Sequence, residues 1–125
     1  MAIIKKLINP LALHDRIFWW SFFVAAPVLN ALSFGLILWK IMPLRGAREA
    51  FALHYNIYFG IDLIGPWYKM FLMPGAALLF WLLNLILASV SYGANRALAY
   101  FAAGLTLFLQ ILIFAATMLV VLLNL

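Results

Sequence analysis

Three long stretches without a charged residue constrain this chain more than any other feature. They are Ile17–Trp39, Met70–Tyr92 and Ala97–Leu123. A bilayer core about 30 Å thick is crossed by about 20 apolar helical residues, so each stretch is long enough to span it. Only helices and closed barrels satisfy the backbone in hydrocarbon, and these continuous runs lack the alternation of barrel strands. We therefore predict an all-α integral membrane protein, a single domain (1–125) with transmembrane helices at 17–39, 70–92 and 97–123.

The composition excludes most other classes of protein. About 70% of the residues are apolar and 9% are charged, which neither a soluble domain nor a disordered chain would show. Cysteine is absent, which excludes disulfide frameworks and thiolate metal sites. The net charge of +5 fits a membrane surface, since the chain has no recognition motif of a nucleic-acid reader. The predicted partner is therefore the lipid bilayer, with no nucleic acid.

Three segments connect or flank the predicted spans. Residues 1–16 are either a short interfacial helix or a basic tail, residues 40–69 form a long structured loop, and residues 93–96 are a turn that makes the last two helices an antiparallel hairpin. The positive-inside rule compares Lys and Arg on the two sides of the membrane. The comparison is a tie, with Lys5, Lys6, Arg16 and Arg96 on one side and Lys40, Arg45, Arg48 and Lys69 on the other.

Each predicted span carries one carboxamide near its middle. These residues are Asn30, Asn84 and Gln110, which would lie at similar depth in a folded bundle. A side-chain amide in hydrocarbon needs a hydrogen-bond partner, and the amides can serve one another. They therefore predict either packing between helices or a polar path at mid-membrane. Amides carry no charge and cannot relay protons as carboxylates do.

The loop at 40–69 holds most of the remaining polar chemistry. Residues 47–53 favour a short interfacial helix, and the alternation over 54–59 indicates an extended segment. Gly60 and Gly65 are turn signals, and Asn56 and Asp62 are residue types that stabilise turns through nearby backbone N–H groups. The loop is thus expected to form a cap over the helix ends.

An active site in this loop would depend on His54. A His54–Asp62 pair could perform acid–base chemistry, but residues 40–69 contain no serine or cysteine nucleophile. A metal site would need Glu49 as a third ligand brought to the same place. We expect instead a buried His54–Asp62 hydrogen bond that fixes the loop, with no catalytic residue, metal or cofactor. His54 could also sense pH.

The order of residues in the loop resembles a known bacterial pattern. Pro43 precedes a His-aromatic-Asn motif, and Gly, Asp and Gly follow before the next span; the matching residues are His54, Tyr55, Asn56, Gly60, Asp62, Gly65 and Lys69. This order resembles the small membrane domain of SdpI-type toxin-immunity and signalling proteins. The stretch between Pro43 and His54 is longer here than in that domain. The resemblance implies a binding or immunity role, an extracytoplasmic loop, a bacterial inner membrane and a cytoplasmic N-terminus.

Three hypotheses on function follow from the sequence. The first is a non-enzymatic binding protein, either an accessory subunit or an immunity-type protein, that meets a membrane partner through the loop and helices. The second is a pore or transporter module that works as a homo-oligomer. The third is a membrane enzyme that uses His54. Three short spans enclose no substrate cavity by themselves, which favours the first.

Overall fold

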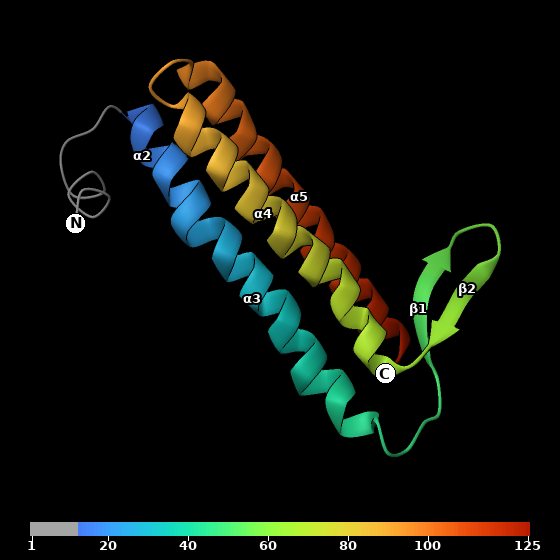
Figure 1. The fold of residues 1–125 in the computed structure, drawn as a ribbon. Coiled ribbons are helices and arrows are strands. Elements are labelled where there is room, and N and C mark those ends of the chain that lie inside the picture. The colour runs from blue at the N-terminus through green and yellow to red at the C-terminus, as the bar shows by residue number, and fades with distance from the viewer. Residues whose placement is uncertain (1–12) are drawn as a thin grey trace.

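The structure is a computed structural model that describes the chain from Leu13 to Leu125. Three helical stretches are long and apolar enough to cross a membrane: Asp15–Leu44, Trp67–Ser91 and Arg96–Leu123. They lie side by side in one elongated bundle (Figure 1). The predicted fold class is therefore confirmed, with one addition, a small two-stranded sheet. The predicted segment at 1–16 lies almost wholly outside the described residues.

The first span is longer than predicted and is not a uniform α-helix. It consists of α2 (Leu13–Trp20), a π-helical segment (Ser21–Ala25), α3 (Ala26–Leu36), a second π-helical segment (Ile37–Ile41) and a 3₁₀ turn (Met42–Leu44). A proline follows each π-helical segment closely: Pro27 the first and Pro43 the second. Because proline has no N–H, the helix there cannot keep its regular hydrogen bonds, and wider turns accommodate the loss.

The second and third spans form the predicted helical hairpin. A 3₁₀ turn at Trp67–Phe71 leads into α4 (Leu72–Ser91), and α5 spans Arg96–Leu123. The side chain of Asn95 caps α5, since its Oδ1 accepts the Leu98 N–H at 3.2 Å. The turn is thus centred one residue earlier than predicted, and Arg96 belongs to the helix.

Two apolar clusters hold the ends of the bundle together. One contains Phe18, Trp19, Phe22, Ala88, Ala99, Ala102 and Ala103. The other contains Ile37, Ile41, Phe51, Met70, Val120 and Val121. The second cluster includes Phe51 from the loop, so the loop is part of the packed structure. Many other leucines and phenylalanines on the helices stay exposed, such as Leu119 at 66% and Phe101 at 68%, as lipid contact requires.

The loop between the first two spans folds as a β-hairpin. Strands β1 (Phe51–Asn56) and β2 (Gly60–Gly65) pair antiparallel, from Phe51 opposite Gly65 to Asn56 opposite Gly60. The predicted helix over 47–53 is therefore wrong, because its second half forms the start of β1. The predicted extended segment begins three residues earlier than expected and ends at Asn56, where the turn starts. Figure 1 shows the hairpin projecting from the side of the bundle at the end where α5 finishes.

Candidate functional site

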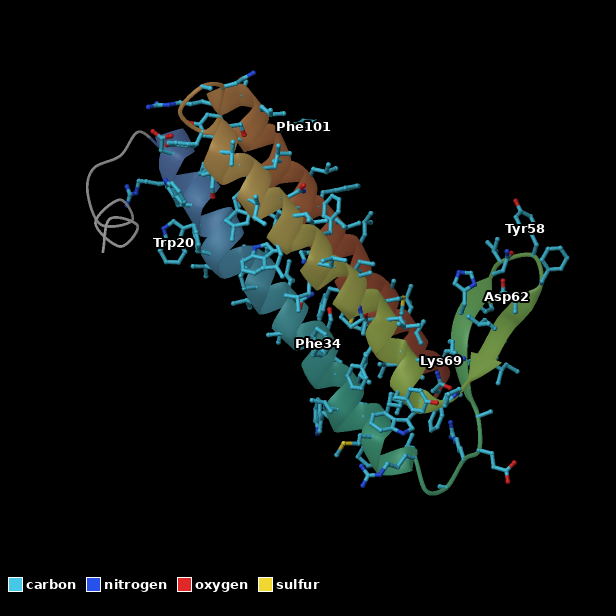
Figure 2. The ribbon with its side chains drawn as sticks, in the orientation of Figure 1. Trp20, Phe34, Tyr58, Asp62, Lys69 and Phe101 are labelled. Atoms are coloured by element: carbon cyan, nitrogen blue, oxygen red, sulfur yellow. The ribbon has the colours of Figure 1, made fainter. Side chains whose placement is uncertain are left out.

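The β-hairpin brings together most of the loop residues that the sequence singled out. His54, Tyr55 and Asn56 lie on β1, and Gly60, Asp62 and Gly65 lie on β2. Lys69 follows in the 3₁₀ turn that precedes α4. Figure 2 shows Tyr58 at the far end of the hairpin and Lys69 near its base. The hairpin is thus the candidate site, with its base on the bundle and its tip away from it.

The turn of the hairpin is set by Asn56 and Gly60. The Tyr58 N–H donates to Asn56 Oδ1 at 2.8 Å, which is the local bond expected of this residue type. Gly60 has a φ of +74°, a conformation that residues with a Cβ rarely adopt. Between them the turn presents three apolar or aromatic side chains, Ile57, Tyr58 and Phe59, which are 81%, 87% and 82% exposed. The tip therefore offers an open apolar surface.

His54 and Asp62 form a cross-strand pair. The distance between His54 Nδ1 and Asp62 Oδ1 is 2.7 Å. The bond is present as expected, but it is not buried, since the two side chains are 59% and 35% exposed. Among residues 13–125, no three His, Asp or Glu side chains gather as metal ligands would. Asp62 thus bonds to a side chain across the hairpin, whereas the sequence suggested a bond to nearby backbone.

Gly65 is placed where a side chain would collide with the hairpin. A Cβ at this position would lie 2.8 Å from Leu53 Cδ1. Leu53 packs against the apolar cluster that contains Phe51 and Met70. Glycine at 65 therefore leaves room for the end of the Leu53 side chain where the hairpin meets the bundle.

Asn124 attaches the hairpin to the end of α5, and sequence analysis missed it. Its Oδ1 accepts the Ala52 N–H at 2.8 Å, and its Nδ2 donates to the Ala52 carbonyl, also at 2.8 Å. The side-chain amide of Asn124 thus bonds to the backbone of β1 in the way that a neighbouring strand would. Arg48 adds a hydrogen bond to the Asn124 carbonyl. The sequence signal for this attachment is that Asn124 is the one polar residue among the apolar residues 118–125.

A groove separates the middle of the hairpin from the bundle. Its volume is about 370 Å³, and its lining consists of His54, Tyr55, Met73, Ala116, Leu119, Val120 and Leu123. Five of these residues are apolar side chains of α4 and α5. The groove is the size of a small ligand pocket, but its chemistry is that of the lipid-facing helices that form it.

The three predicted carboxamides bond within the bundle. Asn30 Nδ2 donates to Gln110 Oε1 at 3.3 Å and to the Pro74 carbonyl at 2.9 Å. Gln110 Nε2 donates to the Ala77 carbonyl at 3.0 Å, and both amides are buried. Asn84 does not join them and donates to Thr106 Oγ1 at 2.8 Å. The amides therefore link helices in this structure, and only two of the three bond to each other.

A further link joins α4 to the first span. Ala26 N–H donates to the Ser21 carbonyl, one residue further back than in an α-helix, and Pro27 has no N–H. The Phe22 carbonyl thus lacks both helical donors, and Trp81 Nε1 donates to it at 2.8 Å. The mid-span tryptophan is therefore a packing residue whose N–H fills a position that the proline leaves open.

A buried carboxylate lies at the opposite end of the bundle. Asp15 is 6% exposed, and its Oδ1 accepts hydrogen bonds from the hydroxyls of Tyr92, at 2.6 Å, and Tyr100. Arg96 Nη1 lies 3.9 Å from Asp15 Oδ2. Tyr92 lies just beyond α4, and burial, followed by the Asp15 carboxylate, raises the pKa of its phenol. The sequence pattern does not reveal this cluster, because its members are common interfacial residues far apart in the chain.

Comparison with known proteins adds no relative to this description. No protein-family model matches the chain, and neither does any curated protein or any solved structure. Function must therefore be argued from the geometry above.

Proposed function

We propose that this protein is a non-enzymatic membrane protein that binds a protein partner along the outer edge of β2. The partner would add an extended segment as a third strand of the hairpin. It would be another membrane protein, with this chain as its accessory subunit or as an immunity-type binder. The resemblance of the loop to SdpI-type domains supports the second role, together with a bacterial inner membrane and a cytoplasmic N-terminus.

The observation that carries this proposal is the difference between the two edges of the hairpin. The β1 edge is occupied at Ala52 by the amide of Asn124. Within the described part of the chain, the hydrogen bonds of the β2 backbone go only to β1. An open strand edge is a template for another chain, because its unpaired N–H and C=O groups need partners. Strand addition to such an edge is a recurrent form of peptide recognition.

The arrangement of the polar side chains supports binding over the alternatives. A pore lined by the central amides would require Asn30 and Gln110 to exchange their buried bonds for water. An enzyme that used His54 would need further polar groups around a bound substrate, whereas the groove beside His54 is otherwise lined by Tyr55 and by apolar side chains of α4 and α5. Neither alternative is favoured by a specific observation.

Site-specific photo-crosslinking in native membranes tests the proposal. A photoreactive amino acid replaces Ile64 on β2, which is 63% exposed, or Val90 on the lipid-facing surface of α4, which is 78% exposed. We expect a discrete protein adduct from position 64 and none from position 90. An adduct with twice the mass of the chain would favour the homo-oligomer. The absence of any protein adduct at position 64 would contradict the proposal.

A further inference from the structure

The position of the hairpin relative to α5 fixes its depth in the membrane. His54 and Tyr55 line one side of the groove, and the other side includes Ala116 and Leu123 of α5. These two helical positions are about 10 Å apart along the axis, at about 1.5 Å per residue. The hairpin therefore runs alongside the last turns of a membrane-spanning helix. In Figure 1 the strands run from the end of the bundle where α5 finishes partly back along its length, while diverging from the helices.

Aromatic residues mark the membrane boundary near the base of the hairpin. Trp39 is near the end of the first span, and Trp67 and Tyr68 immediately precede the second span. Trp39 and Tyr68 are 68% and 59% exposed. Such rings prefer the level of the lipid headgroups. The exposed cation Lys69 directly follows Tyr68 near the base of the hairpin (Figure 2), where it can meet anionic headgroups.

The surface of the hairpin matches a lipid environment in both polarity and charge. Its tip, Ile57–Phe59, is apolar and more than four-fifths exposed, and Ile61, Leu63 and Ile64 of β2 are also exposed. Several exposed apolar side chains on one element mark a site of contact with a protein or a membrane. Asp62 is the one carboxylate on the hairpin, and His54 pairs with it, which reduces the cost of placing it near hydrocarbon.

We infer that the hairpin is an interfacial anchor whose tip side chains enter the boundary between headgroups and acyl chains next to α5, while its backbone, with the open edge of β2, stays at the level of the headgroups. The occupant of the groove beneath it is a phospholipid acyl chain, because the helix surfaces that line the groove are continuous with the exposed lipid-facing residues of the same turns. This inference goes beyond the proposed function and does not depend on a protein partner. It places the open edge of β2 at the membrane boundary, where only a membrane-bound partner can reach it.

Site-directed spin labelling tests the inference directly, because the chain has no cysteine of its own. Single cysteines replace Tyr58 or Phe59 at the tip, and the labelled protein is placed in bilayers of phosphatidylcholine and phosphatidylglycerol. Glu49→Cys, an exposed position in the connection before β1, is the water-exposed reference. Leu119→Cys on α5 is the lipid-facing reference. Collisions of each label with oxygen, which enters lipid, and with a water-soluble nickel chelate are then measured.

The expected ratio of oxygen to nickel collisions at positions 58 and 59 is close to that at position 119 and several-fold above that at position 49. A ratio at both tip positions equal to that at position 49 would overturn the inference. Low collision rates with both reagents at the tip would mean that protein covers it, which also overturns insertion into lipid. The photo-crosslinking result at position 64 is independent of all three outcomes, so either proposal can fail alone.

Discussion

Replacement of Asn124 by alanine is the sharpest test of how the hairpin is held. The variant removes the amide that bonds both the N–H and the C=O of Ala52, which is 9% exposed. A buried backbone group left without a partner costs about 1–3 kcal/mol. Water can reach the edge of a hairpin in part, so we expect the two groups together to cost about 2–4 kcal/mol of hairpin attachment. The lost bond between Asn124 Nδ2 and the Val120 carbonyl adds little, because it lies within one helical turn.

Hydrogen–deuterium exchange of the hairpin amides in lipid nanodiscs measures this cost. A tenfold change in the opening equilibrium corresponds to about 1.4 kcal/mol, so exchange should quicken by roughly 30- to 700-fold over 51–65. Asn95→Ala is the matched control, since it removes a hydrogen bond of a side-chain amide at the opposite end of the bundle. The control should leave the hairpin unchanged. If Asn124→Ala exchanged no faster than the unchanged protein, the hairpin would be held by the packing of Phe51 alone and our reasoning would be refuted.

Three further predictions concern the bundle itself. Trp81→Phe removes the N–H that bonds the Phe22 carbonyl and should lower the free energy of unfolding by about 1 kcal/mol. Pro27→Ala restores a backbone N–H, so the loss caused by Trp81→Phe should be smaller in the double variant. Unfolding titrations in detergent measure both effects. A double-mutant cycle on Asn30→Leu and Gln110→Leu should give a coupling of about 0.6 kcal/mol and at most about 1.7, with zero coupling contradicting their bond. The pKa of Tyr92 is raised in the folded state, so the folded protein holds the phenol proton more tightly than the unfolded chain does. The contribution of Tyr92 to the free energy of unfolding should therefore be complete below about pH 10 and decrease above it. Tyr92→Phe should weaken the decrease of the thermal unfolding temperature above that pH.

The transmembrane helices could be predicted from the sequence because their signal is local. Each span is an uncharged run, and the requirement for internal hydrogen bonds in lipid leaves helix as the only solution. The positions of the central amides could be predicted for the same reason. The hydrogen-bond partner of each amide could not be predicted. Asn84 bonds to Thr106 on α5 because of how the two helices pack, and hydropathy does not encode that packing.

The strand that replaced the predicted helix shows where local signals fail. Residues 47–53 contain Ala, Arg, Glu and Leu, which favour helix by intrinsic propensity. The strand β1 is instead fixed by Asn124, 72 positions away, and by burial of Phe51 among residues of two other helices. Tertiary contacts of this separation override a preference of a few tenths of a kcal/mol per residue. The Asp15 cluster was missed for the same reason, as its two tyrosines are 77 and 85 positions away.

The two ends of the bundle differ in a way that bears on function. At one end the buried charge of Asp15 is surrounded by hydroxyls and an arginine from the α4–α5 turn and the start of α5. A buried charge without these partners would cost several kcal/mol, so this end resists separation of the first span from the other two. At the other end the hairpin is linked to α5 by the hydrogen bonds of Asn124 with Ala52 and Arg48, and by the packing of Phe51. The attachment of the hairpin can therefore open without disturbing the Asp15 cluster, as the proposed role of the hairpin in recognition requires.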